Sequence, residues 1–157
     1  MTVRSAENSF QKGLKMQREG RLLEAMAYFE AAMVGDRKRN PGAPNMKYQS
    51  YFAVCMAVVT RDLKEAVSLC RKAAEREFYN PEIFYNLGRI HLLCGARQPA
   101  VEAYLRGLGI DRSHPGMRAE MRRLGLRRAP LFRFLRRGHL LNRLAGQLRT
   151  SLPGLTR

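Results

Sequence analysis

The sequence repeats a pattern of small and aromatic residues at an interval of 34 residues. Three pairs of positions show this spacing: Ala66 and Ala100, Cys70 and Tyr104, and Pro81 and Pro115. An interval of this length is typical of stacked pairs of antiparallel helices, in which each pair buries its apolar face only against its neighbours. No stretch alternates with the two-residue period of a sheet strand. The sequence therefore predicts an all-α solenoid of helix–turn–helix units.

Three copies of the pattern can be aligned. The third copy contains Phe84, Leu87, Gly88, His91, Gly95, Ala100, Tyr104 and Gly107. The first copy keeps Gly13, Gly20, Ala25, Phe29 and Ala32, and the looser second copy keeps Ala53, Ala66, Cys70 and Ala73. Over about residues 5–114 this pattern resembles the tetratricopeptide repeat (TPR) family. The resemblance implies a right-handed solenoid of three repeats, at about residues 5–39, 46–79 and 81–114.

Local signals divide each repeat into two helices. Asp62 with Glu65 forms a capping-box pattern, and Asn80-Pro81 combines an N-cap residue with a proline at the first helical position. Gly20 marks the turn inside the first pair, as Gly95 does inside the third. We expect helices near residues 5–18, 21–35, 46–59, 62–77, 81–94 and 97–109.

About seven extra residues separate the first two copies, because Ala25 and Ala66 are 41 residues apart. Most of them fall within Gly35–Pro44, whose composition predicts a loop.

A seventh helix is predicted over residues 115–124, with Gly125 as its C-terminal stop. Its apolar stripe of Met117, Met121 and Leu124 can cover the exposed end of a solenoid, with arginines on the outside. We therefore divide the chain into a TPR-like solenoid over residues 1–125, with 115–124 as the cap helix, and an Arg-rich amphipathic extension over residues 126–157.

The charge of the chain is concentrated at its C-terminal end. Residues 112–157 contain twelve arginines and a single acid, Glu120, and so carry +11 of the total net charge of +16. Four leucines in the extension, Leu140, Leu141, Leu144 and Leu148, have the spacing of one helix face. The candidate residues for binding a polyanion are Arg127, Arg128, Arg133, Arg136, Arg137 and Arg143.

Four interpretations of the extension remain open. Its apolar face could pack on the solenoid with the arginines solvated, or the arginines could bind the phosphates of RNA or DNA. A basic amphipathic helix also suits an acidic lipid surface, and an acidic protein partner is the fourth possibility. A tail that uses only arginine can equally reflect a GC-rich genome.

The sequence has few features of an enzyme or a metal site. Its three cysteines are far apart and form no Cys-x-x-Cys pair, and its three histidines share no ligand spacing with them. We find no glycine-rich phosphate loop and no paired carboxylates on one helix face. We therefore predict no catalytic activity, no metal and no cofactor. The N-terminus has no signal-peptide pattern, so a cytoplasmic location is expected.

The resemblance implies that the first helix of each pair lines a concave groove, which in TPR proteins receives a partner's extended peptide or helix. The principal candidates here are Gln11, Arg18, Lys47, Tyr51, Val58, Tyr85, Asn86 and Arg89. Further lining residues are Glu7, Leu14, Val54, Glu82 and Leu93.

Some TPR domains hold a partner's C-terminal carboxylate with a fixed set of Lys, Asn and Arg residues. Only Asn86 and Arg89 fall at comparable places in this sequence, while Phe10 and Leu14 stand where that set would be polar, so we predict that this carboxylate clamp is absent. The predicted function is that of a non-catalytic adaptor or scaffold that binds a protein partner in its groove. The alternative is binding of RNA or another polyanion, including acidic lipid, through the extension.

Overall fold

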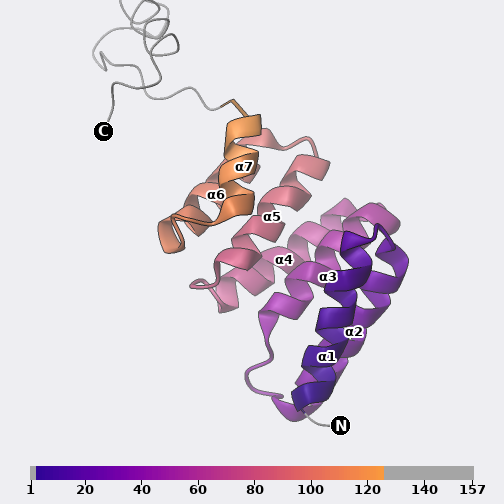
Figure 1. The fold of residues 1–157 in the computed structure, drawn as a ribbon. Helices are drawn as coiled ribbons and strands as arrows, with labels where there is room; N and C mark the ends of the chain where they lie inside the picture. The colour runs from indigo at the N-terminus through magenta and orange to yellow at the C-terminus, as the bar shows by residue number, and fades with distance from the viewer. Residues whose placement is uncertain (1–2, 126–157) are drawn as a thin grey trace, which may run out of the picture. The chain divides into compact units, whose positions relative to one another are not determined.

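Seven α-helices make up most of residues 3–125, the part of the chain that our computed structural model describes (Figure 1). They are α1 (Val3–Arg18), α2 (Leu22–Arg39), α3 (Met46–Val59), α4 (Leu63–Arg76), α5 (Pro81–Leu93), α6 (Arg97–Ile110) and α7 (Pro115–Arg123). The described residues contain no strand, which confirms the all-α prediction. Every predicted helix is present, and most of the predicted ends are within three residues of the observed ones. The candidate arginines of the extension lie outside the described residues.

The three turns inside the helix pairs have the same geometry. Gly20 and Gly95 both adopt positive φ angles, of 78° and 69°, as their places in the repeat require. In the second pair the equivalent residue is Arg61, which takes a φ of 62° although it has a side chain. In each turn the carbonyl of this residue accepts a hydrogen bond from the N–H two residues later. The left-handed conformation is therefore set by the fold of the pair, and the second pair adopts it at an energetic cost.

The predicted helix starts are capped as expected. The Asp62 side chain accepts a hydrogen bond from the N–H of Glu65 at 3.0 Å, and the Asn80 side chain accepts one from Glu82 at 3.2 Å. Asn45 caps α3 in the same way, through the N–H of Lys47. These bonds satisfy N–H groups that a helix leaves unpaired at its start.

The loop predicted over Gly35–Pro44 is shorter than expected, because α2 continues to Arg39. Asp36 explains the difference. Its buried carboxylate accepts hydrogen bonds from the side chain of Asn40 at 3.0 Å and from the backbone N–H of Asn45 at 2.6 Å. An acid that composition assigns to a solvated loop thus ties the last turns of α2 to the start of α3.

Close packing within a pair depends on a small residue facing a ring. A Cβ added at Gly13 would lie 2.6 Å from the ring of Phe29, and one added at Gly88 would overlap the ring of Tyr104. Both rings are fully buried. The Gly-to-aromatic spacing found in the sequence therefore marks the positions where the two helices of a pair touch.

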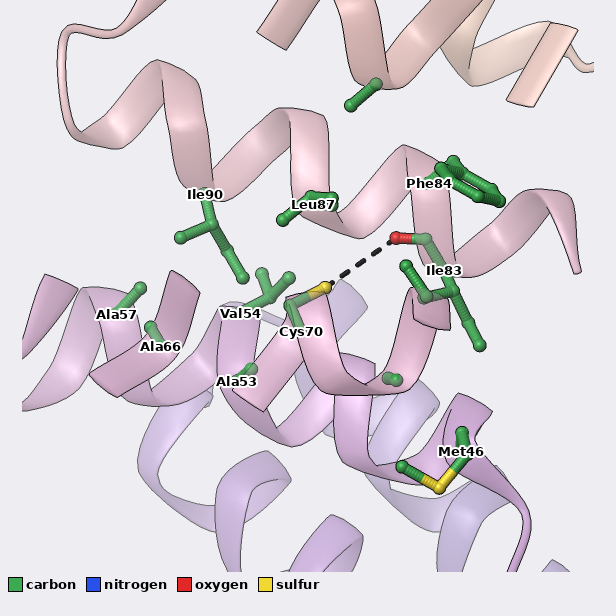
Figure 2. Close-up of a cluster of buried hydrophobic side chains, with 13 residues drawn as sticks. Met46, Ala53, Val54, Ala57, Ala66, Cys70, Ile83, Phe84, Leu87 and Ile90 are labelled. Atoms are coloured by element: carbon green, nitrogen blue, oxygen red, sulfur yellow. Dashed lines mark hydrogen bonds between the residues drawn. The ribbon is translucent and has the colours of Figure 1, made fainter. Parts of the chain in front are cut away.

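Neighbouring pairs share a core of aliphatic and small side chains. Figure 2 shows Val54 of α3, Cys70 of α4 and Ile90 of α5 packed in one cluster. The Cys70 thiol lies 3.6 Å from the backbone carbonyl oxygen of Ile83, and burial raises the pKa of this thiol to about 12. A second cluster surrounds Phe10 and Phe29 in the first repeat. Burial between pairs is the main source of stability in such stacked folds.

Helix α7 packs against α6 through Met117. This side chain is fully buried, and its sulfur occupies the space that a Cβ on Gly107 would need. Gly125 follows with a φ of 57°, in agreement with its predicted role as a helix stop. None of the described helices is long and apolar enough to cross a membrane.

Candidate partner-binding surface

The first helices of the three pairs, α1, α3 and α5, carry the residues predicted to line a groove. Most of these side chains reach the surface: Gln11 and Arg18 are exposed, while Lys47, Tyr51, Val58, Tyr85 and Arg89 are half-buried. Leu14 is also half-buried, and Glu7 and Leu93 are exposed.

Two predicted lining residues are not available to a partner. Val54 belongs to the hydrophobic cluster between the second and third pairs. Asn86 is fully buried, and its side-chain N–H donates to the hydroxyl of Ser50 at 3.0 Å. The Ser50 hydroxyl in turn donates to the carbonyl of Lys47. Asn86 thus joins α5 to α3. Consecutive side chains of a helix point in different directions, so Asn86 faces the interior although the preceding residue, Tyr85, reaches the surface.

A continuous chain of contacts runs across α1, α3, α5 and the start of α7. We call it the aromatic–cation row, and its members in order of contact are Lys47, Phe10, Tyr51, Glu82, His114, Tyr85 and Arg89. Phe10 and His114 are buried, and the other five members are half-buried. The row therefore presents rings and charged groups at a surface shared by all three repeats.

Each end of the row is a cation held over a ring. The Lys47 ammonium lies 5.1 Å from the centroid of the Phe10 ring, and the Arg89 guanidinium carbon lies 5.6 Å from that of Tyr85. Cation–π attraction of this kind fixes a long side chain without neutralising its charge. Among the described residues, neither cation has a carboxylate partner within 4.0 Å.

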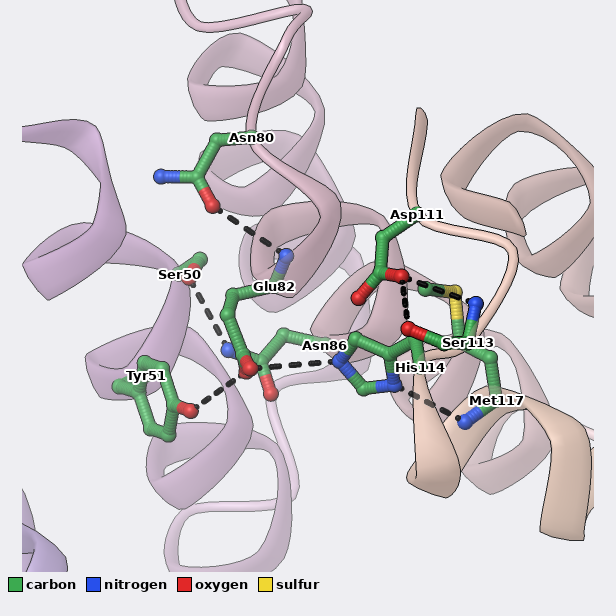
Figure 3. Close-up of polar contacts among 9 residues, drawn as sticks. All are labelled: Ser50, Tyr51, Asn80, Glu82, Asn86, Asp111, Ser113, His114 and Met117. Carbon is green, nitrogen blue, oxygen red and sulfur yellow. Dashed lines mark hydrogen bonds and ion pairs between the residues drawn. The ribbon is translucent and has the colours of Figure 1, made fainter. Parts of the chain in front are cut away.

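The centre of the row is a hydrogen-bonded network around Glu82 (Figure 3). One carboxylate oxygen accepts from the Tyr51 hydroxyl at 2.7 Å, and the other pairs with Nε2 of His114 at 3.2 Å. The Nδ1 atom of His114 accepts from the backbone N–H of Met117, so Nε2 carries the hydrogen and donates to Glu82. Burial, followed by the charge of Glu82, raises the pKa of Tyr51 well above its ordinary value. The tyrosine therefore remains a hydrogen-bond donor at neutral pH.

The role of His114 was not predicted from the sequence, where only its lack of a metal-ligand spacing was noted. The signal was present, because His114-Pro115 stands 34 residues after Asn80-Pro81 and so occupies the next N-cap position of the repeat. His114 caps α7 with one nitrogen and binds Glu82 of α5 with the other. The start of α7 is thereby joined to the third repeat.

A second tyrosine–carboxylate pair joins the first and second repeats. The Tyr48 hydroxyl donates to one oxygen of Glu7 at 2.8 Å, and the side-chain N–H of Gln11 donates to the other at 2.6 Å. Tyr48 also packs against Phe10, with 4.8 Å between ring centroids. The two carboxylates of this surface, Glu7 and Glu82, are thus both engaged by neighbouring hydrogen-bond donors.

The described residues contain no group of three or more His, Cys, Asp or Glu side chains able to hold a metal ion. Cys55 and Cys70 are buried, and Cys94 is exposed. Burial raises the pKa of the Cys55 thiol to about 11, and the nearby charge of Arg89 opposes this shift. The surface formed by α1, α3 and α5 offers half-buried rings and charged side chains for contact.

Comparison with known proteins confirms the resemblance. Residues 81–114 match the family model of the tetratricopeptide repeat. No curated protein matches the sequence.

Several solved TPR domains have a similar fold at 18% sequence identity. The first TPR domain of human RPAP3 has a TM-score of 0.63, with 79% of this chain and 92% of that chain covered. The first TPR of Spaghetti (RPAP3), bound to the HSP90 peptide SRMEEVD, has a TM-score of 0.62, with 80% and 96% covered. The Arabidopsis OM64 TPR domain has a TM-score of 0.60, with 78% and 96% covered. Residues 81–114 thus match a tetratricopeptide repeat, and the fold of the chain is similar to that of solved TPR domains.

Proposed function

We propose that this protein is a non-catalytic adaptor that binds a peptide or helix of a protein partner on the surface formed by α1, α3 and α5. The observation that carries the proposal is the aromatic–cation row, which crosses all three repeats with half-buried rings and cations at its surface. Half-buried tyrosine and arginine side chains are the residue types that contribute most to protein interfaces. The similar TPR domain of Spaghetti, which binds an HSP90 peptide, supports the same kind of role.

The mode of binding should differ from a C-terminal carboxylate clamp. Phe10 is 1% exposed and lies beneath Lys47, and Leu14 packs against the cluster around Phe10 and Phe29. Neither side chain can donate a hydrogen bond to a carboxylate. We therefore expect this chain to recognise its partners without contacting a free C-terminus.

A selection from a library of random displayed peptides tests the proposal. The full chain is the bait, and the enriched peptides are then measured by fluorescence anisotropy against a double variant, Tyr51→Ala with Tyr85→Ala. The matched control is Phe78→Ala with Tyr79→Ala, which removes an equally aromatic but exposed pair from the loop between α4 and α5. Circular dichroism is used to check that both variants keep their helices.

Loss of peptide affinity in the first variant with little change in the control would support the proposal. Equal loss in both variants, or enrichment of no peptide, would contradict it.

The second candidate is binding of RNA or another polyanion through residues 126–157. Eight arginines and no acid in this segment favour it, because phosphate contacts depend on clustered cations. The test is the affinity for a single-stranded RNA at increasing ionic strength, with a variant in which Arg127, Arg128, Arg136 and Arg137 are replaced by alanine. Binding that falls steeply with salt and is lost in this variant would support the second candidate, and unchanged binding would exclude it.

A further inference from the structure

The charged groups in and near the aromatic–cation row do not pair with one another. Two carboxylates are already engaged by other donors: Glu7, next to the row, by Tyr48 and Gln11, and Glu82, within it, by Tyr51 and His114. These donors are neutral groups, with His114 in the tautomer assigned above. They hold the carboxylates in place without using either of the nearby cations.

The cations have rings as neighbours in place of acids. Lys47 rests over Phe10 and Arg89 over Tyr85, and neither forms an ion pair with a described residue. Residues 126–157 contain no aspartate or glutamate, so no acidic side chain of that segment can pair with them either. Each cation is therefore a positive charge held in place without a direct ion-pair partner among the described residues.

Partial burial makes these charges suitable for binding. A half-buried cation has lost part of its hydration, and a ring beneath it limits its rotamers, so less entropy is lost when a ligand binds. A guanidinium stacked on a ring still directs its N–H groups outward along its edge. A carboxylate that reaches Arg89 can accept two of these hydrogen bonds at once.

We propose that this surface binds an internal acidic segment of a partner protein, with Asp or Glu side chains received by Arg89 and Lys47. The inference rests on the proposed function and specifies the chemistry of the partner. It also separates this chain from domains that hold a terminal carboxylate, because a side-chain carboxylate can approach Arg89 anywhere along a peptide. The apolar neighbours of such a residue would lie on Tyr51 and Tyr85.

A peptide suits this surface better than a nucleic acid. Glu7 and Glu82 are held on the same surface by Tyr48 and Tyr51, and they would repel a continuous phosphate backbone, whose binding depends on many cations in succession. A peptide can place carboxylates only where the cations are and uncharged side chains elsewhere. The pattern of two cations among fixed acids therefore favours a sparsely acidic peptide.

The test uses fluorescent peptides that are acetylated and amidated at their ends. Each carries two glutamates separated by a varied number of alanines and flanked by leucines, and each has a twin with glutamine in place of glutamate. Affinities are measured by anisotropy with the full chain, a double variant Lys47→Gln with Arg89→Gln, and a control Lys64→Gln with Lys72→Gln. The control removes the same charge from exposed positions on α4.

We expect at least one glutamate peptide to bind about tenfold or more tightly than its glutamine twin, as is typical of hydrogen bonds to a charged group. The Lys47/Arg89 variant should lose this preference and the control should keep it. A thermal melt checks that the variants are equally folded.

Four results would overturn the inference. Equal binding of the glutamine twins would mean that the surface recognises apolar side chains alone, which leaves the adaptor function standing. Equal weakening by the control would place the acidic peptide elsewhere, and binding of the same peptides only when their C-terminus is left unamidated would indicate a carboxylate clamp. Absence of binding by every peptide, while a single-stranded RNA binds and depends on Arg89, would assign the surface to nucleic acid.

Discussion

Replacing Gly88 by alanine would place a methyl group against the ring of Tyr104. Both residues are buried where α5 and α6 touch, and Tyr104 is fully enclosed, so the ring has no open space to move into. Overpacking of this kind costs typically about 1–3 kcal/mol. Alanine also returns up to about 1 kcal/mol through its higher helix propensity. With the full helix-propensity gain subtracted, the expected net loss of unfolding free energy is up to about 2 kcal/mol.

Gly35→Ala is the matched comparison, because Gly35 also lies inside a helix but has space beside it. A Cβ there would meet Ala6 at 3.6 Å, an ordinary contact. The helix-propensity gain is then not offset, and we expect a stabilisation of about 0.5–1 kcal/mol. The same substitution thus has opposite signs at the two positions.

Urea denaturation followed by circular dichroism at the helical band measures both variants. An unchanged m-value, the slope of the unfolding free energy against urea concentration, would show that the substitutions act on the folded state. A stable Gly88→Ala protein would refute the predicted contact with Tyr104. A destabilised Gly35→Ala protein would refute the continuation of α2 to Arg39 and favour the loop that composition predicts.

Four further predictions concern individual side chains and the cysteines. Tyr104→Phe should raise the unfolding free energy by about 1 kcal/mol, because its buried hydroxyl has no hydrogen-bond partner among the described residues; a lower stability would mean that this hydroxyl is satisfied. Arg61→Gly should stabilise the protein by about 1 kcal/mol in a thermal or urea titration, since it removes a side chain from a left-handed backbone position; a loss would mean that the Arg61 side chain contributes more than the strain costs. In the native protein, a thiol reagent near neutral pH should modify the exposed Cys94 readily and leave the buried Cys55 and Cys70 unmodified. Burial also raises the pKa of Cys55 to about 11 and that of Cys70 to about 12, which disfavours their reactive thiolate forms. In denaturant all three cysteines should react. Rapid labelling of all three thiols in the native protein would contradict the burial of Cys55 and Cys70. Because these two thiols hold their protons more tightly in the folded state, the unfolding free energy should also fall as the pH rises above about 9, the ordinary pKa of a thiol.

The helices were predictable because their signals are local. The Gly-to-aromatic spacing marks where two helices touch, as Gly13 with Phe29 illustrates. Cap residues such as Asp62 act within one turn, so their effect can be recognised without a tertiary structure. The resemblance to the repeat family then placed the first helices on a common surface.

Interactions between distant residues could not be predicted in the same way. Asp36 has the composition signal of a loop, but its carboxylate binds the N–H of Asn45 and the helix continues past it. Asn86 was placed on the groove by its position in the repeat, yet its side chain is turned toward Ser50 and buried. Both outcomes depend on a partner that lies across a helix–helix contact.

The number and kind of helices follow from the sequence, because the period of small and aromatic residues, the caps and the turn glycines act over short distances. Which charges on α1, α3 and α5 are available depends on contacts made in the folded protein. Glu82 and Arg89 are equally polar in the sequence, but Tyr51 and His114 satisfy the acid while Tyr85 only supports the cation. That difference arises because a hydroxyl or imidazole N–H can donate to a carboxylate, whereas a ring face attracts a guanidinium without neutralising it.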